Sequence, residues 1–463
     1  MKQLLAYCLS IILCVSFTGC MENYLDLYPE DKITSASFPE NESDIKLLLN
    51  GVYAQLREKE VYNQGLFGFG ITDGATPNAF NWGTDEVFNK LGAGRLSSSD
   101  GGVVTYRWKR CYEIISRANY LLACMDLVDL SEEAKAKYSG ETHFLRGLAY
   151  SVLAETYGGV PIILTDISTE EARSLKRASL EETWQQALDD YEVAITNLGV
   201  DAPEPGRATK GAALGMKMRA YLYQGKYKEV LSCVEQIDAL KKYGLFHSYE
   251  GLFDPANENN KEVLFDIQYI EGENSQGSYI DQYCGTGTGS WTRGSRYVPT
   301  DDLVAAYETI DGSPVDPENP YENRDPRLGF TAVLPGSYFL GYRFPNYLYP
   351  GGAFNHAGNR LKHLSTRKYR IQDESKLPPS GQSYINDIIL RYADVLLSKA
   401  EAIIETNGSV ADAIAILNRI RTERDDVKIS LLPTSMSREE AREKVRHERR
   451  IAPVRRHRAA PSC

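Results

Sequence analysis

The sequence predicts an all-α protein in which antiparallel helices pack in pairs and two long loop segments depart from this helical frame. Apolar residues recur at helical spacing in several segments, and a glycine or asparagine separates one run from the next. Two long segments, 65–102 and 272–379, are instead rich in Gly, Asn, Ser, Pro and aromatic residues. Loops of that length are usually functional or disordered, and their aromatic content disfavours disorder.

The clearest helix pair lies between Thr209 and Leu240, with its turn at Gly225. Its apolar positions are Leu214, Met218, Tyr221 and Leu222 before the turn, and Tyr227, Val230, Leu231, Val234 and Ile237 after it. The run Ala220-Tyr221-x-x-Gln224-Gly225-x-Tyr227 follows the turn of a tetratricopeptide repeat, where small and aromatic residues let two antiparallel helices pack. Several pairs of this kind bury their faces against one another and form a stable scaffold.

Further helices follow the same plan. A second pair is predicted from Ile389 to Ile420, with its turn at Asn407-Gly408. Two looser patterns run from Phe144 to Leu153 and from Trp184 to Ile195, and a short one runs from Asp302 to Tyr307.

The N-terminal residues have the pattern of an export signal. Lys2 precedes an apolar run from Leu4 to Phe17 that is too short to span a bilayer, and Phe17-Thr18-Gly19-Cys20 supplies small residues for cleavage. With cysteine first in the mature chain, the segment resembles a bacterial lipoprotein signal. We therefore expect residues 1–19 to be removed and Cys20 to be acylated, which would tether the chain to a membrane surface. An ordinary secretory signal is the alternative.

Composition narrows the possible partners and cofactors. The formal net charge of −11 over 463 residues disfavours nonspecific binding to nucleic acid. Outside the signal and Cys20, the cysteines are scattered: Cys111, Cys124, Cys233, Cys284 and Cys463. Without Cys-x-x-Cys spacing they argue against a zinc site or a disulfide framework, and the first three are expected to be buried apolar residues. We expect no cofactor and no metal.

Signals for catalysis are poor. The glycine-rich Gly285-x-Gly287-x-Gly289 lacks the Lys-Ser/Thr ending of a phosphate-binding loop, and neither Gly-x-Ser-x-Gly nor His-Glu-x-x-His occurs. The acidic run from Asp311 to Glu318 lacks the spacing of an EF-hand, so a turn is expected there. Since a glycosidase needs only two suitably placed acids, that activity stays an alternative to a non-catalytic protein.

Several motifs follow one another along the mature chain: Tyr24-Leu25-Asp26-Leu27, Arg117-Ala118-Asn119, Phe144-Leu145-Arg146-Gly147-Leu148-Ala149-Tyr150, Tyr157-Gly158-Gly159-Val160-Pro161, Thr209-Lys210-Gly211-Ala212-Ala213, Asn323-Arg324-Asp325-Pro326-Arg327, Leu390-Arg391-Tyr392-Ala393-Asp394-Val395-Leu396-Leu397, Ala400-Glu401-Ala402 and Arg446-His447-Glu448-Arg449-Arg450. In this order and spacing, over most of residues 20–451, they resemble the SusD/RagB family of outer-membrane lipoproteins. After Ile451 the sequence departs from the family pattern, so a truncated or frameshifted end is expected, with a functional basic tail as the alternative.

The resemblance implies tetratricopeptide-like helix pairs in a right-handed superhelical scaffold with an irregular, loop-rich lobe, divided into a SusD-like region at 20–240 and a SusD/RagB region at 241–463. It also implies a cell-surface role in the outer membrane: capture of oligosaccharides or polysaccharides for a SusC-like TonB-dependent transporter. Capture of peptides, as implied for RagB-like members, is the alternative cargo.

Pyranose rings stack on aromatic side chains while their hydroxyls need amide or carboxylate partners, so a glycan site requires exposed Trp or Tyr beside such groups on loops. Trp108 and Trp184 lie in helical patterns and are expected in the core. The candidate glycan-binding residues lie in the loop-rich segments: Asn81, Trp82, Tyr279, Tyr283 and Trp291. The resemblance places aromatics of its glycan binders at comparable positions along the chain. Packing of these aromatics inside the lobe is the alternative.

Overall fold

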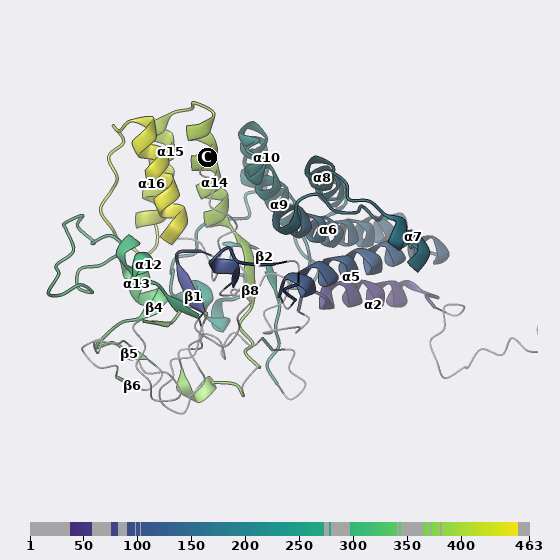
Figure 1. Ribbon diagram of the computed structural model, residues 1–463, viewed down its shortest axis with the longest axis horizontal. Helices are drawn as coiled ribbons and strands as arrows, with labels where there is room; N and C mark the ends of the chain where they lie inside the picture. Colours follow the sequence, from purple (N-terminus) through teal and green to yellow (C-terminus); the bar gives the residue numbers. More distant parts are fainter. Residues whose placement is uncertain are drawn as a thin grey trace, which may run out of the picture.

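Helices dominate the computed structural model, which describes residues 38–57, 76–81, 90–97, 99–101, 103–272, 277–278, 297–339, 342–343, 364–369, 371, 373–379 and 382–451. The long helices are α2 (Glu42–Ala54), α5 (Val103–Cys124), α6 (Glu132–Tyr157), α8 (Leu180–Asn197), α9 (Lys210–Tyr223), α10 (Tyr227–Ala239), α14 (Tyr392–Glu405), α15 (Val410–Thr422) and α16 (Arg438–Ile451). Each packs on the next, from α2 on α5 to α15 on α16 (Figure 1). This stack confirms the predicted all-α, tetratricopeptide-like fold.

Both clear helix pairs are confirmed. α9 and α10 meet at Gly225, whose φ of +69° is a left-handed conformation that glycine adopts without strain. α14 and α15 meet at Asn407, which also has a positive φ, of 61°. Capping fixes where α9 begins, because the Thr209 hydroxyl accepts a hydrogen bond of 3.1 Å from the Ala212 amide.

The looser helical patterns are confirmed as well. The pattern from Phe144 to Leu153 belongs to α6, and the one from Trp184 to Ile195 belongs to α8. α12 (Asp301–Ala306) covers the short pattern that was predicted near Asp302.

Ile389 was predicted to open a helix, and this part of the prediction is wrong. It lies in strand β8 (Asp387–Arg391), which pairs antiparallel with β2 (Val263–Ile267), and α14 begins only at Tyr392. All five residues of β8 are buried, a run that fits a strand covered on both faces better than one stripe of a helix.

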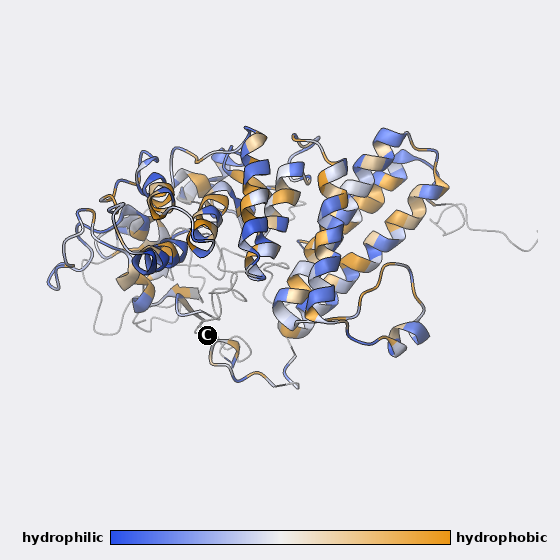
Figure 2. Cartoon of the chain, turned by 90° about the horizontal axis from the view of Figure 1, so that it is seen from above, coloured by the Kyte–Doolittle hydropathy of each residue, from blue (hydrophilic) through white to orange (hydrophobic). Residues whose placement is uncertain are grey.

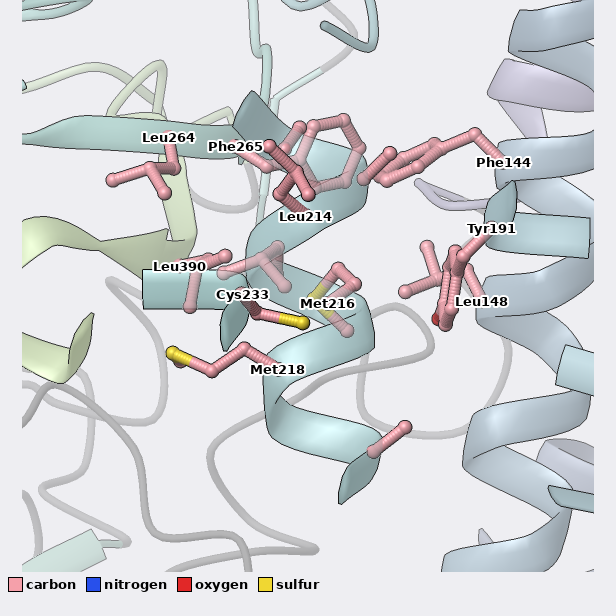
Figure 3. Close-up of a cluster of buried hydrophobic side chains, with 14 of the residues drawn as sticks. Phe144, Leu148, Tyr191, Leu214, Met216, Met218, Cys233, Leu264, Phe265 and Leu390 are labelled. Atoms are coloured by element: carbon pink, nitrogen blue, oxygen red, sulfur yellow. The ribbon is translucent and has the colours of Figure 1, made fainter. Parts of the chain in front are cut away.

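The main core joins the helices to this two-stranded sheet. In Figure 3, Leu214 and Met216 of α9 lie between Phe144 and Tyr191 on one side and Leu264 and Leu390 on the other. A Cβ atom on Gly215 would lie 2.2 Å from a methyl of the buried Leu390, so any side chain here would push Leu390 out of its place between α9 and the strands. The core extends from α2 to α16 and so contains residues from both sides of the predicted division at residue 240, which stays a prediction.

The three cysteines within the described helices are free and buried, as expected. Burial raises the pKa of the Cys111 thiol to about 12 and that of Cys233 to about 11. Both thiols therefore stay protonated at neutral pH and act as small apolar residues.

The loop-rich lobe beside the helices is confirmed too. Its short elements are β1 (Ala79–Asn81), η2 (Gly251–Phe253), η3 (Pro255–Asn257), β3 (Tyr297–Pro299), α12, α13 (Pro326–Thr331), β4 (Ala332–Val333), β5 (Tyr338–Phe339), β6 (Tyr342–Arg343), β7 (Ser365–Thr366) and η4 (Glu374–Lys376). The strands pair two by two: β1 with β3, β4 with β7, and β5 with β6. Figure 2 shows that polar and apolar residues alternate along the helices. Among the described helices, none combines the length and the apolar character that a membrane span requires.

The acidic run from Asp311 to Glu318 forms turns, as expected. Asp311 accepts hydrogen bonds from the Ser313 amide and hydroxyl, and Asp316 accepts one from the Glu318 amide. Within the described ranges, no group of three or more His, Cys, Asp or Glu side chains is placed to hold a metal ion.

Buried ion pairs join the lobe to the last helices. Arg327 of α13 pairs with Asp325 at 2.7 Å and with Glu448 of α16, while Arg421 of α15 pairs with Glu448 at 3.4 Å and with Glu308 at 2.7 Å. Arg327, Arg421 and Glu448 are each 1% exposed or less. Burial lowers the pKa of Arg327, but Glu448 and Asp325 outweigh it and raise that pKa above its ordinary value, so the guanidinium stays charged.

A second buried group ties β8 to β2. Glu262, just before β2, accepts from Arg391 at 2.7 Å and from Arg424 at 2.6 Å, and all three side chains are nearly inaccessible. Burial raises the pKa of the Glu262 carboxyl, but the two arginines outweigh it and hold that pKa below its usual range.

Asn386, just before β8, links β8 to the end of β2. Its amide donates to Glu258 at 2.8 Å, its side-chain oxygen accepts from the Tyr269 amide at 2.9 Å, and its side-chain nitrogen donates to Asp266 at 3.3 Å. Burial raises the pKa of Glu258 to about 7 and that of Asp266 to about 6. Both carboxyls therefore hold their protons to a higher pH in the folded state than in the unfolded chain.

We predict that Glu448→Gln lowers the free energy of unfolding by about 3–5 kcal/mol, because it leaves two buried arginines without a shared counter-charge. Urea unfolding followed by circular dichroism measures this. The matched control is Glu443→Gln on the same helix, since Glu443 and its partner Arg446 are both more than half exposed and such a pair contributes roughly 0–1 kcal/mol. Equal losses in the two variants would contradict a special role for the buried pairs.

We predict that Asp266→Asn becomes progressively more stable than the wild type as the pH rises from about 4 to 6. A raised folded-state pKa means that the native state binds more protons than the unfolded chain in this window, so wild-type stability falls as the pH rises through it. The gain approaches roughly 1–3 kcal/mol, measured by urea unfolding at pH 4 and pH 7.

The control is Asp373→Asn, because hydrogen bonds from Ser375 lower the pKa of that exposed carboxyl. Its stability relative to the wild type should change with pH in the opposite direction. A pH-independent difference for Asp266→Asn would refute the prediction.

Candidate functional site

The β1–β3 ribbon sets the position of the two loops that carry the candidate tryptophans. Its register pairs Ala79 with Pro299, Phe80 with Val298 and Asn81 with Tyr297. Because the strands are antiparallel, the chain leaves β1 toward residue 82 at the same end of the ribbon where it enters β3 from residue 296. The early loop and the middle loop are therefore rooted side by side.

The opposite end of the ribbon is fixed to α12 and α16. The Thr300 amide donates to the Asn78 carbonyl at 3.0 Å, and the Thr300 hydroxyl donates to the Pro77 carbonyl. Thr300 also caps α12, which packs on α16, and Arg450 near the end of α16 donates to the Asn78 side chain at 2.9 Å. Asn78 is 6% exposed, and a buried amide with partners on both sides holds its strand firmly.

The middle loop has a second root at residues 277–278. Ser278 exchanges backbone hydrogen bonds of 2.7 and 3.0 Å with Ser383, and both residues are buried. A Cβ atom on Gly277 would lie 2.4 Å from the backbone of Gln382, so the close contact of the two segments requires glycine here. Tyr279 follows this root directly, and Trp291 lies six residues before β3.

The predicted site residues fall mostly outside the described ranges. Asn81 ends β1, and its backbone alone is described. Five further predicted residues lie outside the described part of the chain: Trp82, Tyr279, Tyr283 and Trp291 for the glycan site, and Cys20 for lipid attachment. Their roles stay predictions.

The two tryptophans that were expected in the core behave differently. Trp184 is 6% exposed, which confirms its expected place. Trp108 is only partly buried: it packs against the core, with ring contacts to Tyr112 of α5 and to Tyr157 at the end of α6.

Sequence reasoning missed the residues that hold the ribbon. Asn78 precedes a three-residue strand that has no alternating pattern of its own, and the patterns of the sequence did not indicate its contact with Arg450, 372 positions later. The sequence did mark Arg450 as a residue of interest, because it lies in one of the motifs that carry the family resemblance.

Family models match most of the chain in two parts. The model described as "SusD family" matches residues 261–452, and the model described as "Starch-binding associating with outer membrane" matches residues 23–222. Among curated proteins, a SusD-like protein P25 of Formosa agariphila is 26% identical over 91% of this chain and 81% of its own length. A SusD-like protein of Bacteroides ovatus is 24% identical over 88% of this chain and 73% of its own length.

Solved structures share the fold. A SusD-like carbohydrate binding protein from Bacteroides fragilis superposes with a TM-score of 0.79 at 28% identity, covering 89% of this chain and 83% of that chain. A laminarin binding SusD-like protein superposes with a TM-score of 0.69 at 20% identity, covering 89% and 88%. From its sequence and its fold, the chain belongs to the SusD family.

Proposed function

We propose that this protein is a non-catalytic, lipid-anchored glycan-binding protein of the outer membrane. It captures oligosaccharides or polysaccharides at the cell surface and delivers them to a SusC-like TonB-dependent transporter. Asn81, Trp82, Tyr279, Tyr283 and Trp291 form the platform on which sugar rings stack.

The comparisons support the ligand class. The family model that matches the N-terminal half is described as starch-binding, and the Bacteroides fragilis structure at 28% identity is described as carbohydrate binding. The outer-membrane location is supported by the description of the same family model. The lipid on Cys20 and the transporter partner rest on the signal-like N-terminus and on the family resemblance.

The observation that carries the proposal is the pairing of Asn81 with Tyr297. It roots the loop that begins with Trp82 beside the loop that contains Trp291, although the two tryptophans are far apart in sequence. A flat sugar ring needs aromatic faces close together, and loops rooted on one anchored ribbon satisfy that requirement.

The described acids suit a binding protein better than a glycosidase. A glycosidase needs an acid with a raised pKa that faces the sugar. Of the described carboxyls, Glu141, Glu258 and Asp266 have a pKa raised by burial. Glu141 accepts a hydrogen bond from Tyr53, while Glu258 and Asp266 both accept from Asn386. These acids are occupied by structural partners, which suits a binding protein.

We predict that Trp82→Ala and Trp291→Ala each weaken glycan binding roughly tenfold, because each removes one stacking face. Isothermal titration with a panel of soluble polysaccharides measures the change. The control is Tyr338→Ala, since Tyr338 is a lobe aromatic that is 67% exposed outside the two loops.

Unchanged affinity in both tryptophan variants would remove the proposed platform. Binding of short peptides in the same titrations, with no binding of any polysaccharide, would instead favour the peptide cargo.

We predict that no new reducing ends appear when the full chain is incubated with each polysaccharide that it binds. A reducing-sugar assay measures this, with a known glycanase as the positive control. Steady release of reducing ends that Asp266→Asn or Glu258→Gln abolishes would establish a glycoside hydrolase.

A further inference from the structure

An open hollow lies on helix α5, within the helical stack. Its volume is about 470 Å³, and the described residues that line it lie on one face of α5: Trp108, Lys109, Tyr112, Glu113, Ser116 and Arg117. Pockets that hold small ligands typically measure roughly 300–1,000 Å³ and combine aromatic walls with a few polar groups. The hollow has a comparable volume and a similar mixture of residues, but it is wide open to solvent, so a ligand there would lie on the helix surface and would not be enclosed.

The aromatic wall is fixed before any ligand arrives. The rings of Trp108 and Tyr112 lie 5.0 Å apart and are tilted by 44°, and the edge of Tyr157 packs on Trp108 at 5.2 Å. The Tyr112 hydroxyl donates to the Pro161 carbonyl at 2.8 Å. Arg177 lies 6.0 Å from the Trp108 ring. Rings held in this way lose little freedom on binding, which favours affinity.

Arg177 belongs to the connection between α6 and α8. It donates to the Gly159 carbonyl at 2.6 Å and to the Tyr157 carbonyl at 2.5 Å, so it is held at the end of α6. The rest of this connection, which carries α7 (Thr169–Ser174), projects away from the helices (Figure 2).

The polar rim of the hollow carries positive charge. Among the described lining residues Glu113 is the only acid, and it pairs with Arg110 at 2.6 Å and with Lys109 at 3.6 Å. Arg117 is exposed, and among the described residues its contact is a single long hydrogen bond of 3.4 Å to the Gly51 carbonyl. The guanidinium is therefore able to turn toward a ligand, and it suits a carboxylate or sulfate oxygen pair.

We propose that this hollow is a second saccharide site, separate from the loop platform, which takes an acidic pyranose. The apolar face of the ring stacks on Trp108 and Tyr112, and its carboxylate or sulfate group binds Arg117. The choice of a sugar rests on the proposed function, whereas the preference for an acidic one comes from the charges of the rim. A long glycan held at both sites would dissociate more slowly than one held at either.

The test uses the full chain with Trp82→Ala and Trp291→Ala already present, so that the loop platform is disabled. Isothermal titration measures binding of acidic tetrasaccharides of galacturonate, of guluronate and of sulfated chondroitin, with maltotetraose as the neutral comparison. In this background at least one acidic tetrasaccharide should bind with a stoichiometry of one, and more tightly than maltotetraose.

Two added variants locate the site. Trp108→Ala and Arg117→Glu should each weaken binding roughly tenfold, through lost stacking and reversed charge respectively. Tyr120→Ala is the matched control, because Tyr120 is 39% exposed on the same helix but does not line the hollow. Arg117 lies at the surface, so Arg117→Glu tests the site even if Trp108→Ala fails to fold, which thermal unfolding reports.

The outcomes separate the two proposals. Unchanged affinity in Arg117→Glu, or no binding of any acidic tetrasaccharide at millimolar concentration, overturns the second site and leaves the loop platform to its own test. If Trp82→Ala and Trp291→Ala do not affect any ligand while Arg117→Glu weakens acidic ones, the second site stands and the loop platform fails.

Discussion

The buried ion pairs around Glu448 are the constraint on which the rest of the lobe depends. One carboxylate on α16 meets Arg327 from the lobe and Arg421 from α15, and Arg421 also reaches Glu308. Charges this deeply buried are tolerated only when every partner is present, so the lobe has one position against the helices. α16 also positions the β1–β3 ribbon. Arg450, two residues after Glu448, donates a hydrogen bond to Asn78, which precedes β1.

Two different kinds of packing therefore stabilise the helices and the lobe. The helices are fixed by a continuous apolar core, which needs only correctly spaced Leu, Ile, Ala and Tyr. The lobe has small apolar clusters and short ribbons, so polar contacts such as those of Asn386 and Glu262 have to supply its order. Such a lobe can vary its loops without disturbing the scaffold, and for that reason it is a suitable place for ligand recognition.

The two proposed sugar sites use these surroundings differently. The loop platform depends on the ribbon that brings the two loops to one place, whereas the hollow on α5 depends on the spacing of Trp108 and Tyr112, one helical turn apart. The positive rim of the hollow is notable on a chain whose net charge is −11, because a local basic group attracts acidic ligands that the rest of the surface repels.

The sequence by itself determined the helices and their turns, because these depend on residues close together in the chain. The apolar spacing before and after Gly225 predicts α9 and α10, and Asn407-Gly408 predicts the turn between α14 and α15. Ile389 was assigned to a helix because nothing local reveals its partner strand β2, more than 120 residues earlier. Arg327 and Glu448 both lie in motifs that carry the family resemblance, but only the tertiary structure shows that their side chains pair. The same holds for the candidate site. Trp82 and Trp291 can be chosen from the composition of the loops in which they lie. The common root of these loops and the partial exposure of Trp108 depend on contacts between distant parts of the chain, which no local pattern encodes.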